Sequence, residues 1–304
     1  MPARTKIGIV TVTYNSGEVL EDFLSSLDAQ THDNFVLYAI DNASSDSTLE
    51  QLAPPRNFPV VVTANADNVG IAVGNNQGII QALADKCDWV LLLNNDTILP
   101  PTTIDALADS AVRNSAEILS PLIEASEPPS TIWYAGGQIK SVARAFQPSH
   151  ELIGEPLAAA PESVMDTAYA STCCLLVAPS VFQSVGLMDP VYFVYYDDLD
   201  FAIRAGRAGH QYVLDPSILM LHKASSLTGG PESKFTIHWM SRNWIILARR
   251  HAHGIGLPLA LGFITAWTFG RWMLRKDSAR LLVPRLRAYR EGLTVSLKSS
   301  PPSL

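Results

Sequence analysis

The chain has 304 residues, of which 47% are apolar and 17% charged, and its formal net charge is −7. These values indicate one large or two small globular domains with an ample core, and they exclude a largely disordered chain. An acidic chain also lacks the positive surface of a general nucleic-acid binder, so no nucleic-acid partner is expected. A phosphate-bearing ligand would be a small one, held locally.

Strand-like and helix-like segments alternate over the first 93 residues. Runs rich in β-branched and aromatic residues predict strands at 7–13, 35–40, 60–63 and 89–93. The helices predicted between them are 19–27, a short one from Thr48, and 78–84. This alternation implies right-handed crossovers and predicts an α/β fold with a doubly wound, mostly parallel sheet.

Polar residues follow the first three predicted strands, at the edge where parallel sheets bind ligands. The residues predicted to contact a base or ribose are Thr13, Tyr14, Asn15, Asp41, Asn68, Gly70 and Asn75. Asp41 is placed to accept hydrogen bonds from a base imide or a ribose hydroxyl, and Gly70 lets the backbone approach a ligand. Asx turns and helix caps are the alternative for each position.

The apolar run 89–93 is followed at once by Asn94, Asn95 and Asp96. Such a run predicts a strand buried on both faces in a parallel sheet, with Asp96 at its carboxyl end. A hard oxygen ligand there suits an ion that bridges to a diphosphate, such as Mg²⁺ or Mn²⁺. The alternative is a turn that caps the helix predicted near residue 100.

Between 118 and 168 the periodicity weakens while Pro, Gly and Ser accumulate, which predicts a loop-and-hairpin insertion over the site. Order returns with a predicted strand at 172–177. A short helix at 179–185 follows and is ended by Gly186.

Three carboxylates, Asp197, Asp198 and Asp200, open a predicted helix behind an aromatic stretch. One carboxylate that takes a proton, with neighbours that orient it, is what general-base catalysis needs. Helix capping is the alternative, because acids are favoured at a helix N-terminus. His222 follows an apolar run, where it serves either as a core residue or as a ligand for a divalent ion in the region of Asp96.

Residues 254–270 carry no formal charge, and seventeen such residues are at the lower limit for crossing a bilayer. With basic residues on both sides, an interfacial helix pair or an oligomer contact competes with a membrane span. The downstream basic residues are Arg280, Arg285, Arg287 and Arg290. They suit contact with anionic lipid, and a solvated basic helix is the alternative.

The cysteines Cys87, Cys173 and Cys174 form an odd set without metal-type spacing, so we expect buried thiols in a reducing compartment. The first six residues lack the pattern of a secretory signal. The expected location is therefore cytoplasmic, with association at the inner face of the cell membrane as a further expectation.

In this order, the motifs resemble those of family 2 glycosyltransferases of the GT-A fold, in the bacterial rhamnosyltransferase-like and galactofuranosyltransferase-like branch. The resemblance spans about residues 7 to 250. Its motifs are Thr13-Tyr14-Asn15, Asp41-Asn42, Asn68-x-Gly70, Asn94-Asn95-Asp96, Asp197-Asp198-Leu199-Asp200, Arg204, Gly209 and His222. Asn94 stands where the family's metal motif has its first Asp, which implies a loose metal dependence.

The resemblance implies a GT-A domain over 1–235 and a helical, membrane- or oligomer-contacting segment over 236–304. It implies that Asp96 and His222 hold Mg²⁺ or Mn²⁺, that Asp198 is the general base, and that Asp197 and Asp200 bind acceptor or orient Asp198. Asn95, expected among the nucleotide-binding residues, would contribute only its amide or nothing.

The implied reaction is inverting transfer of a sugar from a nucleotide-diphosphate sugar to a glycan or lipid-linked acceptor. The branch favours dTDP-rhamnose as donor, with UDP-sugars as the alternative. A nucleotidyltransferase would instead show a Gly-rich, basic loop after the first strand, which is absent here. The alternative from another class is a catalytically inactive sugar-binding or scaffold subunit of a polysaccharide assembly complex.

Overall fold

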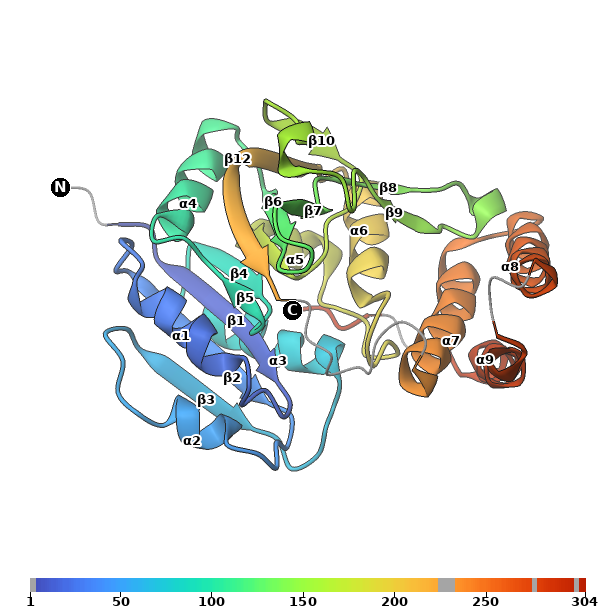
Figure 1. The fold of residues 1–304 in the computed structure, drawn as a ribbon, viewed down its shortest axis with the longest axis horizontal. Helices are drawn as coiled ribbons and strands as arrows, with labels where there is room; N and C mark the ends of the chain where they lie inside the picture. The colour runs from blue at the N-terminus through green and yellow to red at the C-terminus, as the bar shows by residue number, and fades with distance from the viewer. Residues whose placement is uncertain (1–3, 224–232, 275–277, 298–300) are drawn as a thin grey trace.

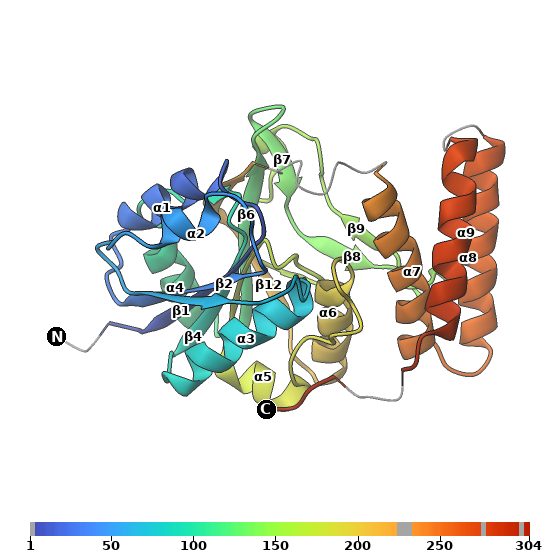
Figure 2. The ribbon, with the colours of Figure 1, turned by 90° about the horizontal axis from the view of Figure 1, so that it is seen from below.

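The computed structural model describes residues 4–223, 233–274, 278–297 and 301–304. A twisted sheet runs through the larger part of the molecule, with helices on both of its faces (Figures 1 and 2). The C-terminal helices gather at one side. The predicted α/β fold with a helical C-terminal extension is confirmed.

The central sheet has the strand order β10-β12-β6-β11-β4-β1-β2-β3, with β5 paired to β12 and β7 to β6. Its strands are β1 (Ile7–Thr13), β2 (Phe35–Asp41), β3 (Val60–Ala64), β4 (Trp89–Leu93), β5 (Thr97–Ile98), β6 (Ile118–Ala125), β7 (Thr131–Tyr134), β10 (Met165–Thr167), β11 (Cys174–Val177) and β12 (Tyr212–His222). A separate hairpin is formed by β8 (Gly137–Ile139) and β9 (Pro148–His150). The first four strands, β1 to β4, pair in parallel, and their predicted positions are confirmed to within a residue.

The helices are α1 (Leu20–Asp28), α2 (Thr48–Leu52), α3 (Ile71–Ala84), α4 (Thr103–Arg113), α5 (Pro179–Val185), α6 (Asp197–Arg207), α7 (Lys234–His251), α8 (Gly256–Met273) and α9 (Ala279–Thr294). Among the described residues, none of these helices is both long and apolar enough to cross a bilayer. All three cysteines are free and buried, as expected.

Strand β4 is buried on both faces, as its uninterrupted apolar run predicts: Val90, Leu91 and Leu92 are fully buried. Its neighbours differ from the prediction on one side. β1 runs parallel to β4, but β11 runs antiparallel to it. An uninterrupted apolar run reports burial, and it does not report the direction of the neighbouring strand.

The prediction that the insertion begins at 118 is wrong, because 118–125 is the sheet strand β6, which pairs with β11 and β12. The strand was not predicted because Ser120 and Pro121 interrupt the apolar pattern. Pro121 is tolerated because it lies in register with Asp215, where the pairing with β12 becomes irregular. The hairpins and short turns that follow, up to Thr167, are the insertion proper.

Helix α3 begins at Ile71, seven residues before the predicted start. Its glycines weaken the helical signal, but they let the helix lie close to β1. A Cβ atom added to Gly74 would stand 2.8 Å from Val12 Cγ2, and one added to Gly78 would stand 2.3 Å from Val10 Cγ1.

We therefore expect Gly78→Ala to destabilise the protein by about 1–3 kcal/mol, because the methyl group overpacks a buried contact. Gly206→Ala in α6 is the control, since nothing lies within 4 Å of its added Cβ, and it should be neutral or slightly stabilising. Urea unfolding of both variants measures the difference. Equal stability of the two variants would contradict the close packing of α3 on β1.

The C-terminal helices are packed onto the sheet domain. Ile246 and Leu247 of α7 belong to the main hydrophobic core, whereas Trp244 and Ile245 belong to a second core formed with α8 and α9. Helix α7 thus stands between the sheet domain and the α8–α9 pair, as Figure 2 shows.

Candidate active site

The carboxyl ends of β1 and β2 meet because the two strands pair in parallel, with Thr13 opposite Asp41. The Thr13 hydroxyl donates to Asp41 Oδ1 at 2.9 Å, and Ser44 donates to both Asp41 oxygens, from Oγ at 2.5 Å and from N at 2.9 Å. Asp41 is fully buried. Asp41 therefore holds the ends of β1 and β2 and the turn after β2 together by hydrogen bonds.

Two predicted nucleotide-binding asparagines stabilise turns at the same edge. Asn15 Oδ1 accepts from the backbone N–H of Ser45 at 2.8 Å, and Asn68 Oδ1 accepts from the N–H of Gly70 at 3.0 Å. Asn15 also has a left-handed backbone, with φ of 49°, which asparagine tolerates well. These contacts match the turn alternative for both residues, and nucleotide contact by either stays a prediction.

Asn75 and Asn95 are nearly buried and bond within the protein. The Asn95 amide donates to the Val12 carbonyl at 2.7 Å, fastening the loop after β4 to β1. The Asn75 amide lies 3.8 Å from Met188 Sδ. Tyr14 differs from them, because 46% of it is exposed, so its ring is the accessible aromatic surface at this edge.

The chain itself makes a close approach at Gly70, and ligand contact there stays a prediction. Gly70 has φ of +84°, and a Cβ there would stand 2.4 Å from the Phe193 carbonyl oxygen, which accepts from Ile71 N–H at 2.7 Å. The segment that leads to the acidic helix α6 is thereby clamped to the start of α3. The segment before the acidic helix α6 therefore lies against the start of α3, next to the loop that contains Asn68 and Gly70.

Asp96 and His222 are 126 positions apart in the chain but lie side by side. The short strand β5 pairs with the end of β12, with Thr97 opposite His222, and Lys223 N–H donates to the Asp96 carbonyl at 2.8 Å. Asp96 Oδ1 and His222 Nε2 are 3.3 Å apart, and both residues are nearly buried. The predicted convergence of these two residues is confirmed.

A divalent ion fits this pair as an incomplete site. Two adjacent ligands of an octahedral ion at about 2.1 Å stand about 3 Å apart, close to the separation seen. In the described ranges, no group of three or more His, Cys, Asp and Glu could hold a metal. An ion here would need further oxygen ligands, which water and a diphosphate supply.

The acidic helix α6 starts after two residues with left-handed backbones, Tyr195 (φ 65°) and Tyr196 (φ 71°). Tyr196 is the N-cap residue and makes no side-chain cap, but Asp198 Oδ1 accepts from the Leu199 N–H at 2.7 Å, which is a contact of the capping kind just inside the helix. Asp197, Asp198 and Asp200 lie inside the first turn, where the helix dipole favours negative charge. Left-handed non-glycine residues are strained and occur often at functional sites.

Asp198 is the aspartate of this turn that accepts a hydrogen bond from a tyrosine. Burial raises its pKa, and the Tyr169 hydroxyl, which donates to Asp198 Oδ2 at 2.7 Å, partly offsets that rise. Burial and the Asp198 charge raise the pKa of Asp197 further, to well above its ordinary value. Of the two carboxyl groups, Asp198 is therefore the one that ionises more readily, and its role as general base stays a prediction.

A row of ring contacts leads from His222, beside Asp96, to Tyr169, which donates to Asp198. The ring of His222 is 4.4 Å from that of Trp133, which is 5.2 Å from His150, and His150 is 5.9 Å from the Tyr169 ring. Trp133 and His150 come from the insertion, on β7 and β9. Asp96, His222 and Asp198 therefore border one region.

The sequence analysis missed Trp133, His150 and Tyr169. Burial lowers the pKa of His150, so its imidazole is neutral, and its buried Nδ1 makes no hydrogen bond within the described residues. The usable signal was the aromatic content of 133–134 and 169 inside a stretch otherwise rich in small and turn-forming residues.

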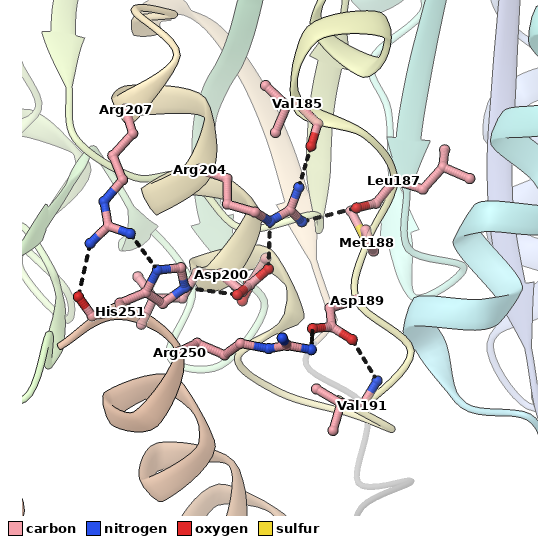
Figure 3. Close-up of polar contacts among 12 residues, drawn as sticks. Val185, Leu187, Met188, Asp189, Val191, Asp200, Arg204, Arg207, Arg250 and His251 are labelled. Carbon is pink, nitrogen blue, oxygen red and sulfur yellow. Dashed lines mark hydrogen bonds and ion pairs between the residues drawn. The ribbon is translucent and has the colours of Figure 1, made fainter. Parts of the chain in front are cut away.

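Asp200 belongs to a buried network that joins α6 to α7 (Figure 3). His251 Nε2 lies 2.8 Å from Asp200 Oδ1, and Arg204 Nε donates to Asp200 Oδ2 at 2.8 Å. Because Arg207 donates to His251 Nδ1 at 3.0 Å, Nε2 carries the proton that His251 donates to Asp200. Both Asp200 oxygens are bonded inside the protein, which favours the orienting role over acceptor binding.

A second ion pair in Figure 3 links the segment before α6 to helix α7. Arg250 donates to Asp189 Oδ2 at 2.6 Å, and Val191 N–H donates to Asp189 Oδ1 at 3.0 Å. Burial raises the pKa of Asp189 despite these partners. Helix α7 thus holds the acidic helix at two points, which is why the C-terminal segment is part of the site's framework.

The family model described as "Glycosyl transferase family 2" matches residues 8–163. The chain belongs to glycosyltransferase family 2. This glycosyltransferase is 33% identical over 295 residues to the N-acetylglucosaminyl-diphospho-decaprenol L-rhamnosyltransferase of Mycobacterium tuberculosis, covering 89% of this chain and 90% of that protein. It is rhamnosyltransferase-like. A low-salt glycan biosynthesis hexosyltransferase, Agl10 of Haloferax volcanii, is 26% identical, covering 66% of this chain and 62% of that one.

Solved structures show that the family 2 enzyme has the GT-A fold. A GalNAc-T7 crystal structure with UDP, GalNAc and Mn²⁺ aligns with a TM-score of 0.67 at 14% identity, over 96% of this chain and 56% of that one. S. aureus TarS 1-349 with UDP aligns with a TM-score of 0.57 at 13% identity, over 93% and 81%. A further TarS structure aligns at 0.55 and 15% identity, over 80% of this chain and 39% of the other.

Proposed function

We propose that this glycosyltransferase moves rhamnose from dTDP-rhamnose to a hydroxyl of a sugar carried on a lipid diphosphate, with inversion at the anomeric carbon. Its similarity to the mycobacterial rhamnosyltransferase, over nearly the whole length of both proteins, supports this donor and acceptor. A UDP-sugar is the alternative donor. The observation that carries the proposal is the row of contacts from Asp96 and His222 to Asp198, which passes through Trp133, His150 and Tyr169.

In the proposed reaction, Asp198 takes the proton of the acceptor hydroxyl while the hydroxyl oxygen attacks the anomeric carbon. The nucleoside diphosphate leaves from the opposite face of the sugar, so the configuration inverts. Tyr169 holds the carboxylate by its hydrogen bond, and Asp197 stays protonated beside it. Asp96 and His222 would hold Mg²⁺ or Mn²⁺, which when bound would offset charge on the departing diphosphate.

The nucleotide would lie at the β1–β2 edge, against the accessible ring of Tyr14 and near Thr13 and Asn15. Asp41 would act by shaping this edge, since both its oxygens bond to neighbouring residues. A lipid-linked acceptor also requires that the enzyme work at a membrane surface, which supports the expected association with the inner face of the cell membrane.

The test incubates the purified protein with N-acetylglucosaminyl diphosphate on a short polyprenol, together with dTDP-rhamnose, UDP-galactose or UDP-N-acetylglucosamine. We expect a product heavier by one rhamnose, formed with dTDP-rhamnose only, with the anomeric configuration opposite to that of the donor by NMR. Transfer from a UDP-sugar alone would overturn the donor assignment. Retention of configuration would overturn the mechanism.

Removing the metal-type pair should weaken nucleotide binding. With Mn²⁺ and dTDP present, we expect Asp96→Asn and His222→Ala to weaken binding about tenfold or more, as loss of a metal ligand or its support does. A tenfold loss corresponds to about 1.4 kcal/mol. Thermal shift measures it, because a ligand that binds the folded state raises the melting temperature.

The matched control is Asp105→Asn, which breaks a similar acid–imidazole pair, Asp105 with His32 at 2.8 Å, away from the site. This variant should keep the full shift that Mn²⁺ and dTDP cause in the wild type. An unchanged shift in both Asp96→Asn and His222→Ala would show that the pair holds no ion with the nucleotide.

A further inference from the structure

Helix α8 buries only one narrow stripe of its surface. The buried residues, spaced four apart, are Gly256, Ala260, Ile264 and Thr268. They face the second core, formed with α7 and α9. At 100° per residue, the opposite side of the helix carries a second stripe, and every member of it is apolar and exposed: Ile255, Leu259, Gly262, Ala266, Phe269 and Met273.

The exposure of this side is large. Ile255 is 79% exposed and Met273 73%. Of the 21 large apolar side chains that are exposed among the described residues, nine lie on α8, α9 and their ends. Apolar residues that are exposed singly are normal, but a large exposed apolar patch is typical of a surface that binds a protein or a membrane.

Helix α9 adds positive charge to this surface. Its side facing away from α7 carries Arg280, Arg287 and Arg290 among Val283, Leu286 and Leu293, all exposed. Arg285, which the sequence suggested as part of this charge, is instead buried with its guanidinium 5.7 Å from the Trp267 ring. Figure 2 shows α8 and α9 together at the edge of the molecule, beyond α7.

The charge favours one occupant over the others. The only carboxylate on α9 is Glu291, and Arg242 of α7 donates to it at 2.6 Å. Between 252 and 274 the sequence has no acidic residue. A twofold contact between copies would place these arginines against like charges, whereas an anionic lipid surface offers phosphates to them and acyl chains to the apolar stripe.

We infer that the outer faces of α8 and α9, which we name the hairpin face, dock on the surface of an anionic lipid bilayer. The members of the hairpin face are Ile255, Leu259, Phe269, Met273, Arg280, Val283, Leu286, Arg287, Arg290 and Leu293. The apolar members enter the headgroup boundary and the arginines contact lipid phosphates. This docking needs no substrate and goes beyond the transfer reaction.

The test is flotation of the full-length protein with vesicles of phosphatidylcholine alone or with 30% phosphatidylglycerol. We expect binding to the anionic vesicles that weakens as salt rises. Arg287→Gln with Arg290→Gln should reduce the partition coefficient about twenty-five-fold, since each arginine near an anionic surface is worth about fivefold. Phe269→Ser with Met273→Ser should reduce it on both kinds of vesicle.

The matched control is Val112→Ser with Arg113→Gln on α4, an exposed apolar and basic pair that lies off the hairpin face. It should bind vesicles as the wild type does. Circular dichroism checks that each variant is folded. No vesicle binding by the folded wild type overturns the inference, and so does equal binding by the control and hairpin-face variants.

Light scattering of the same samples tests the competing occupant. A dimer that Phe269→Ser with Met273→Ser dissociates, without a lipid effect, would assign the hairpin face to a second copy of the chain and overturn lipid docking. Because vesicle binding is measured without donor or acceptor, its failure is distinct from failure of the proposed transfer reaction.

Discussion

Asp198→Asn is expected to lower the rate of sugar transfer about 10²–10⁴-fold, because it removes the carboxylate that takes the acceptor proton. The change is nearly isosteric: the amide oxygen can accept from the Leu199 N–H, as Asp198 Oδ1 does, while the amide nitrogen donates to the Tyr169 hydroxyl. We therefore expect nucleotide binding to be unchanged. Product formation from the preferred donor measures the rate, and thermal shift with dTDP measures the binding.

Tyr169→Phe is the graded companion of this variant. In the proposed reaction Asp198 acts in its ionised form, so we expect the rate to rise with pH through the pKa of Asp198, which burial places above its ordinary value. Removing the donated hydrogen bond raises that pKa further and moves the acidic limb of the kcat profile to higher pH. Transfer by Asp198→Asn at the wild-type rate would assign the base to another group.

The second large effect concerns stability. We expect Asp200→Ala to lower the free energy of unfolding by about 3 kcal/mol, because it leaves Arg204 and His251 without their carboxylate in a buried site. The loss stays at the lower end of the range for such pairs because Arg204 keeps its bonds to the carbonyls of Val185 and Leu187. Urea unfolding measures it.

The pH dependence of that loss has a defined sign. Burial alone would raise the pKa of Asp200, but the hydrogen bond from His251 and the charge of Arg204 outweigh it, and the pKa falls below 3.8. The stabilisation is therefore present above that value and is lost as pH falls through the folded pKa. The stability gap between wild type and Asp200→Ala should narrow below about pH 4.

Asp33→Ala serves as the control, because its ion pair with Arg4 is exposed and screened by solvent. It should leave the unfolding midpoint unchanged. If Asp200→Ala also left it unchanged, the network between α6 and α7 would contribute nothing to holding the acidic helix.

The sequence predicted the first half of the sheet well because buried strands appear in the sequence as continuous apolar runs. Strands β1, β2 and β4 are continuous runs of β-branched and large apolar residues, and turn residues bound them. It failed at β6, where Ser120 and Pro121 break the run, and at α3, where glycines that fit against β1 read as a loop. In both cases tertiary packing overrides the local preference.

The site divides in the same way. The chain order of Asp96, Asp197, Asp198 and His222 pointed to the residues, since carboxylates and imidazoles at strand and helix ends are visible as patterns. Their separation into roles was not visible. Asp198 meets a tyrosine from residue 169, whereas Asp200 meets His251, and no local rule distinguishes two aspartates on one helical turn.

The sequence by itself determined the α/β class, the family of enzymes and the short list of chemical groups, because hydrophobic periodicity and motif order are properties of neighbouring residues. Only the tertiary structure decided which groups meet. The antiparallel β5–β12 pairing brings Asp96 to His222, the insertion places Trp133 and His150 beside Tyr169, and α7 fixes the acidic helix from the far end of the chain. Such contacts join residues that are far apart in the chain and meet only when long loops close around a common core. Patterns of neighbouring residues do not show which distant residues will meet.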